Sequence, residues 1–96
     1  MNVLALDVEL YLPACRSLKE KRAVVKPIVE GARRRFAVAA AEVGGHDHWK
    51  SARLGFAAVA SSAGHASGII DAVERFVWSF PEVEVSSTGR HWVEVT

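Results

Sequence analysis

Residues 3–12 read VLALDVELYL, and this stretch decides the fold. One set of alternating residues is large and aliphatic (Leu4, Leu6, Val8, Leu10 and Leu12), and the other set is Ala5, Asp7, Glu9 and Tyr11. A period of two places the sets on opposite faces of an extended chain, so this stretch is predicted to be a β-strand with one buried face. Pro13 lacks the N–H that the next ladder position needs, so the strand is predicted to end there.

A helix is predicted to begin at Leu18. Ser17 and Glu20 have the spacing of a capping box, in which each side chain accepts from a backbone amide of the first turn. Six apolar residues then share one helical sector, which we expect to face the core: Leu18, Val25, Ile28, Val29, Ala32 and Phe36. Pro27 leaves a helix carbonyl without its partner, which predicts a kink or two shorter helices.

The rest of the chain alternates strands with one more helix. Residues 36–43, closed by Gly44 and Gly45, and residues 51–60 are predicted to pair as an antiparallel hairpin. Ser62 is the predicted N-cap of a second helix, whose apolar residues recur at steps of three and four up to Pro81. Residues 82–96 allow either one long bulged strand or a short hairpin that turns at the glycine.

This order predicts an α+β fold for residues 1–96, a single ferredoxin-like βαββαβ domain. Two helices with one apolar stripe each pack most simply on one face of a four-stranded antiparallel sheet. With 96 residues, 50% of them hydrophobic, the chain can bury one core but cannot form a multi-domain enzyme. A lone Cys15 and the lack of an apolar run of about 18 residues predict a cytoplasmic protein without a membrane partner.

The net charge of +1 hides a strong polarity. Residues 16–35 hold eight basic and two acidic residues, a local excess of +6, whereas from Leu54 onward two basic residues face five acidic ones, a balance of −3. Four cations fall within about 60° of one another on the first helix: Lys19, Arg22, Lys26 and Arg33. Such a ridge can bind nucleic acid by neutralising backbone phosphates, and it is equally typical of a solvated face that keeps a protein soluble.

Two aromatic residues are candidate interface positions. Trp78 projects about 140° away from the apolar stripe of the second helix, and exposed tryptophans are enriched at binding hot spots. Two alternatives are that the C-terminal segment folds over Trp78 or that the helix frays before Pro81. Tyr11 is the one aromatic on the open side of the first strand, too few for an RNA-recognition sheet. That open face suits a partner sheet or a second copy of the chain.

Motifs for catalysis or metal binding are weak. His46 and His48 flank Asp47 as a His-x-His pair, but flanking glycines and the lack of a clear third ligand favour a polar turn over a metal site. Cys15 has no base nearby in the sequence, and Asp7 with Glu9 follows the ordinary pattern of a solvated strand. We therefore predict a non-enzymatic protein without cofactor or metal.

Three stretches taken together resemble a known family. They are Leu12-Pro13 with SLKEKR (17–22) and Val25-Lys26, AEVG (41–44) with Asp47 and Trp49, and Arg53-Leu54-Gly55. They resemble the YlxP-like family of small bacterial proteins, also called domain of unknown function 503. The motif residues are Ser17, Leu18, Lys19, Glu20, Lys21, Arg22, Glu42, Gly44, Asp47 and Trp49. The resemblance implies a ferredoxin-like fold, a bacterial cytosolic origin and genes near translation and ribosome-maturation factors, without an agreed activity.

The basic first helix and this implied context favour a module that associates with RNA or the ribosome through Lys19, Arg22, Lys26 and Arg33. No DNA-binding signature accompanies these residues. The alternative is a protein-interaction module that forms a homodimer through the open sheet face or Trp78.

Overall fold

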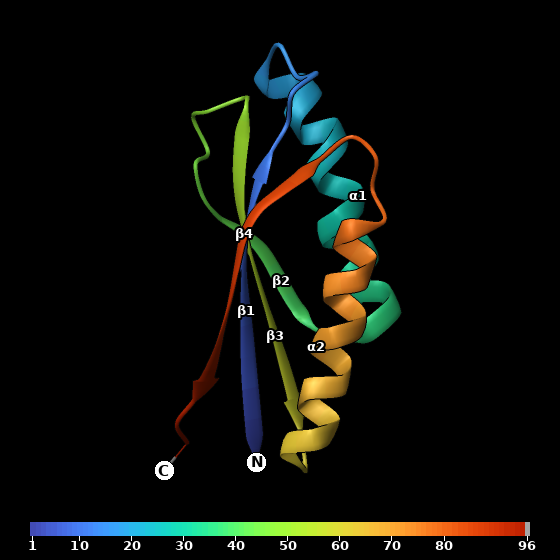
Figure 1. Cartoon of the computed structure of the whole chain (residues 1–96), viewed down its shortest axis with the longest axis vertical. Coiled ribbons are helices and arrows are strands. Elements are labelled where there is room, and N and C mark those ends of the chain that lie inside the picture. Colours follow the sequence, from blue (N-terminus) through green and yellow to red (C-terminus); the bar gives the residue numbers. More distant parts are fainter. Residues whose placement is uncertain (96) are drawn as a thin grey trace.

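The structure, a computed structural model, describes residues 1–95 and has the predicted order of elements. These are β1 (Asn2–Tyr11), α1 (Leu18–Phe36), β2 (Ala39–Gly44), β3 (Ser51–Ala60), α2 (Ala63–Trp78) and β4 (Glu84–Val93). The strands form one antiparallel sheet in the order β2-β3-β1-β4, and both helices cover the same face (Figure 1). The predicted ferredoxin-like class is therefore confirmed. Neither α1 nor α2 has the length and apolar character that a membrane-spanning helix requires.

The core lies between the sheet and the two helices. All five aliphatic side chains of the first alternating stretch, which ends one residue beyond β1, are at most 2% exposed. They meet Ile28 and Ala32 of α1 and Ile70 and Val73 of α2, which belong to the same buried cluster. Burial of this one face explains why aliphatic side chains alternate so strictly along residues 3–12.

Helix α1 is capped by Ser17, whose Oγ accepts from the N–H of Glu20 at 3.1 Å. The other half of the predicted capping box differs: Glu20 Oε1 accepts from the N–H of Arg16, at 2.7 Å, one residue before the cap. The helix also continues through Pro27, so of the two outcomes predicted there, a kink or two shorter helices, the second is wrong. Buried Val25 and Ile28 on either side of Pro27 hold both halves against the sheet, and this packing outweighs the lost hydrogen bond.

The second strand begins later than predicted, because Phe36 belongs to α1. Its ring meets that of Phe76 edge-on, with centroids 5.6 Å apart, which keeps residue 36 on the helix. Ala37 ends α1 in the left-handed conformation at φ 52°. Gly31 permits this close approach of α1 and α2, since a Cβ there would lie 2.7 Å from Phe76 Cζ.

The C-terminal segment forms one bulged strand rather than a hairpin. β4 pairs with β1 from Val3↔Val93 to Tyr11↔Glu84, and its register shifts between Glu9 and Leu10. The predicted glycine turn is absent because Gly89 lies within the strand, opposite Asp7. β4 is therefore one complete edge of the sheet, and β2 is the other.

Candidate functional site

A groove runs between helix α1 and the edge strand β2. Arg22, Lys26 and Arg33 line it together with Val25, Val29, Glu30, Ala41 and Glu42. Three of the four predicted cations thus meet at one surface, and the fourth, Lys19, is exposed on α1 three residues before Arg22, outside the lining. The groove has an apolar wall and several cationic side chains, a combination that suits an anionic ligand with apolar parts.

Arg33 is held in place by the edge of the sheet. Its Nε and Nη2 atoms both donate to the carbonyl oxygen of Ala40, at 3.0 Å and 2.5 Å. A guanidinium has five N–H donors, so three remain for a ligand. Because the planar group is already oriented, Arg33 loses less conformational freedom on binding than a free side chain would.

Two carboxylates also line the groove, and they differ in their partners. Glu42 lies 2.8 Å from Lys21 Nζ and is balanced by that charge. Glu30 is exposed and opposes the charge of Lys26, four residues before it. With Arg22, Lys26 and Arg33 present, the lining keeps an excess of positive charge.

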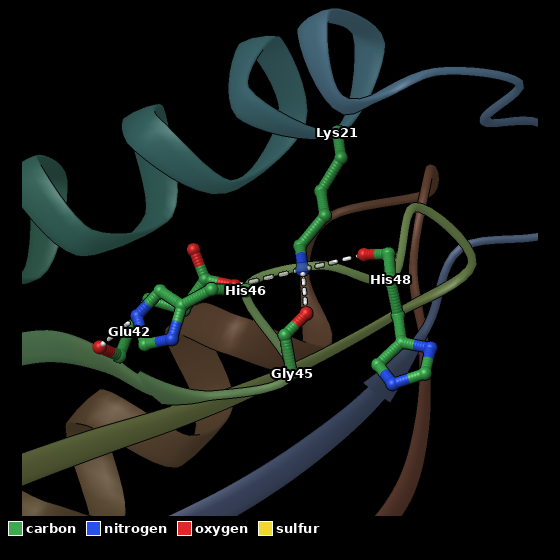
Figure 2. Close-up of polar contacts among 5 residues, drawn as sticks. All are labelled: Lys21, Glu42, Gly45, His46 and His48. Atoms are coloured by element: carbon green, nitrogen blue, oxygen red, sulfur yellow. Dashed lines mark hydrogen bonds and ion pairs between the residues drawn. The ribbon is translucent and has the colours of Figure 1, made fainter.

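Lys21, whose partner Glu42 lines this groove, is only 2% exposed. Its Nζ donates to the carbonyl oxygens of Gly45, at 2.6 Å, and His48, at 2.7 Å, and forms the ion pair with Glu42 (Figure 2). Glu42 Oε2 has no hydrogen-bond partner among the described residues, so this contact is a charge pair rather than a directed hydrogen bond. Lys21 thereby ties α1 to the end of β2 and to the loop that follows.

Sequence reasoning assigned Lys21 only to a motif and missed its burial. A signal was present: Lys21 precedes Val25, Ile28 and Ala32 by four, seven and eleven residues, so it lies on the buried stripe of α1. A lysine on such a stripe needs oxygen partners, because a buried ammonium without them is costly. Those partners come from residues 42–48, whose position depends on the fold.

The loop between β2 and β3 contains the other motif residues. The N–H of His48 donates to Gly45 O at 3.0 Å, and His46 Nε2 lies 3.2 Å from Glu42 O, so this is a closed polar turn. Asp47 and Trp49 are exposed in it. Within residues 1–95, His, Cys, Asp and Glu form no group of three that could hold a metal ion. Cys15, in the segment between β1 and α1, is buried.

The two aromatic interface candidates lie on different surfaces. Tyr11 is 42% exposed at the end of β1, on the open face of the sheet. Trp78 is 60% exposed at the end of α2, so residues 82–95 do not cover it, contrary to one of the alternatives above. The structure therefore does not bring these two residues together into one site.

Asp7 and Arg53 form an ion pair on the open sheet face. Hydrogen bonds from Arg53 hold the pKa of Asp7 below its ordinary value of 3.8, against a smaller opposing effect of burial. Because the pKa is lower in the folded state, this pair stabilises the fold above about pH 4 and the contribution disappears as pH falls through the folded pKa.

We therefore expect Arg53→Met to lower the stability slightly at pH 7 and to have a smaller effect near pH 3, below the ordinary pKa of Asp7. Urea unfolding of both proteins at the two pH values measures the difference. The effect at pH 7 is small because both side chains are partly solvated. A difference that persists unchanged at the acidic pH would mean that Arg53 acts through packing.

Comparison with known proteins gives two sequence matches and a structural one. The profile of a family described as "Protein of unknown function (DUF503)" matches residues 3–90. An uncharacterized protein of Bacillus subtilis (strain 168), YlxP, is 41% identical over 86 residues, which cover 90% of this chain and 94% of that protein. A de novo designed protein with a ferredoxin fold, solved by NMR, superposes with a TM-score of 0.56 at 14% identity, covering 100% of this chain and 89% of the design. This last likeness concerns the fold alone.

Proposed function

The chain belongs to the DUF503 family of proteins of unknown function, and from its surface we propose that it is a non-enzymatic cytosolic module that binds RNA, free or in the ribosome. The binding surface is the groove between α1 and β2. One observation carries the proposal: Arg22, Lys26 and Arg33 line that groove together, and Lys19 extends the same ridge.

The ridge has the chemistry and the length for a phosphate backbone. From Lys19 to Arg33 it covers fourteen helical steps, about 21 Å, which spans several successive phosphates. Lysine and arginine bind such a chain by neutralising phosphates and releasing counterions. Arg33, already fixed on Ala40, offers its remaining N–H groups for a bidentate contact with phosphate oxygens.

The sheet face is a poor alternative surface for RNA. It carries Asp7 and Glu9, which repel phosphate, and Tyr11 is the aromatic residue that β1 offers there. Recognition of bases by stacking needs aromatic platforms on the sheet. We therefore expect backbone binding that depends strongly on salt and little on base sequence, and the gene context implied by the family resemblance favours RNA over DNA.

Charge reversal in the ridge tests the proposal. Lys19→Glu with Lys26→Glu is expected to weaken binding of a fluorescent single-stranded RNA at least tenfold and to abolish co-sedimentation with bacterial ribosomes. Loss of two phosphate contacts should also reduce the slope of log K against log salt by about 1.4. Fluorescence anisotropy over a salt series measures both quantities.

The matched control is Arg34→Glu with Arg75→Glu. Both residues are exposed and lie outside the groove lining, and the net charge changes by the same amount. This control should keep most of the affinity. An equal loss in both double variants would show that net charge alone attracts RNA, and absence of binding by the wild type at low salt would refute the proposal.

A further inference from the structure

The two edges of the sheet differ in how their backbone groups are covered. At the β2 edge, the carbonyl of Ala40 accepts from Arg33, and the carbonyl of Glu42 lies 3.2 Å from His46 Nε2. At the β4 edge, no side chain within residues 1–95 makes a hydrogen bond to the strand backbone. Uncovered edge strands are templates for pairing with another chain, and natural proteins usually protect them.

β4 is also poorly covered by the helices. Eight of its ten residues are exposed, and α2 packs on β1 and β3 rather than on β4. The described side-chain bonds between α2 and β4 come from Arg90, which reaches Asp71 at 2.7 Å and Glu74 at 3.3 Å. A ten-residue strand without proline or lysine is thus open on its outer edge and on much of both faces.

Two exposed tryptophans lie on this same side of the molecule. Trp78 is four residues after Glu74 and therefore lies on the same face of α2, one turn further. Trp92 is two residues after Arg90, on the same side of β4, and is 53% exposed. Figure 1 looks onto this side, with β4 in front of the other strands and α2 in front of α1. Exposed tryptophans flanking a free edge mark a binding surface.

We propose that this α2/β4 side binds a second copy of the chain, with β4 pairing antiparallel to the β4 of that copy. A two-fold axis at Thr88 would put Thr88 opposite Thr88 of the partner subunit and Ser87 opposite Gly89 of the partner subunit, so that uncharged residues meet at the centre. The half that carries Arg90 and His91 would then lie beside the half that carries Glu84 of the partner subunit. Arg90 is already paired with Asp71 and Glu74 of its own chain, and no two like charges of β4 face each other across this axis.

The dimensions of this side allow an interface of the size that a stable dimer needs. A ten-residue strand is about 33 Å long, and the molecule measures 22 Å along its second axis, so the outline of this side limits the contact to at most about 700 Å² per copy. Two copies could therefore bury up to about 1,400 Å², and the roughly 1,000 Å² expected of a specific interface lies within this limit. The α1/β2 grooves would remain free at the two far edges of a continuous eight-stranded sheet.

Sedimentation equilibrium of the full chain tests this assembly, from low micromolar to near-millimolar concentration. We expect a species of twice the 10.4 kDa chain mass. Trp78→Lys with Thr88→Arg should give a monomer, because it places like charges across the axis and removes an anchor. The matched control, Trp49→Lys with Val59→Arg, changes exposed residues of the loop and the open face and should remain dimeric.

Cysteine cross-linking gives a second readout that does not depend on destabilising the interface. Under mild oxidation Thr88→Cys should form a covalent dimer, whereas wild type, whose Cys15 is buried, and Val59→Cys should not. Two results would overturn the proposal. One is a wild-type protein that stays monomeric throughout, and the other is a dimer that Val59→Arg dissociates and Thr88→Arg leaves intact.

Discussion

Replacing Lys21 with methionine is expected to lower the free energy of unfolding by about 3 to 5 kcal/mol. The methionine fills a similar volume, but it leaves the Glu42 carboxylate without its cation and the carbonyls of Gly45 and His48 without their donor. A buried polar group that loses its partner destabilises the fold by the full free energy of its desolvation. Urea unfolding followed by circular dichroism measures the loss as a lower midpoint at a similar slope.

Lys19→Met is the matched control, because it makes the same chemical change on the exposed face of the same helix. Lys19→Met should change the free energy of unfolding by no more than about 0.5 kcal/mol. The double variant Lys21→Met with Glu42→Gln should recover part of the loss, since the stranded carboxylate becomes neutral. If Lys21→Met were no worse than Lys19→Met, the ion pair and the two carbonyl contacts would not hold the loop in solution.

Replacing Pro27 with alanine is expected to raise the free energy of unfolding by about 2 kcal/mol. α1 continues through Pro27, which is exposed, so an alanine N–H can bond the carbonyl of Ala23 without disturbing the core. Proline inside a helix costs about 3 kcal/mol, and its restriction of the unfolded chain offsets up to about 1 kcal/mol of that. Urea unfolding followed by circular dichroism measures this increase in the free energy of unfolding.

Pro81→Ala serves as the control for this gain, because Pro81 lies in the turn after α2 and interrupts no helix. It should leave stability unchanged or slightly lower. Pro27→Ala should also keep the affinity for RNA, since Arg22 and Lys26 stay on the same face. A loss of stability in Pro27→Ala would mean that the packing of α1 requires the geometry that the proline imposes.

Local periods predicted most of the fold. The alternation of residues 3–12 and the stripe around Ile70 and Val73 each depend only on near neighbours in the chain, so both could be recognised before any partner was known. The end of α1 could not, because Phe36 remains helical through its contact with Phe76, forty residues away. The choice between a hairpin and one strand for β4 likewise depended on pairing with β1.

The candidate site likewise has one part that the sequence predicted and another part that only the fold creates. Helical spacing alone grouped Arg22, Lys26 and Arg33, because steps of four and seven residues along one helix bring side chains to the same face in any fold. The groove wall from β2, the anchoring of Arg33 on Ala40 and the exposure of the β4 edge all involve a second element. Sequence patterns do not specify which strand becomes an edge, since strand order depends on how the whole sheet closes around the core.

By itself, then, the sequence determined the order of the elements, the buried faces and the polarity of charge, because each of these follows from the order of side chains along the chain. Only the tertiary structure decided which residues those buried faces contact. Lys21 illustrates the difference: the sequence put a cation on a buried stripe, and only the fold supplied the oxygens of Glu42, Gly45 and His48 that make its burial favourable. Contacts between distant segments depend on chain path, which no local pattern encodes.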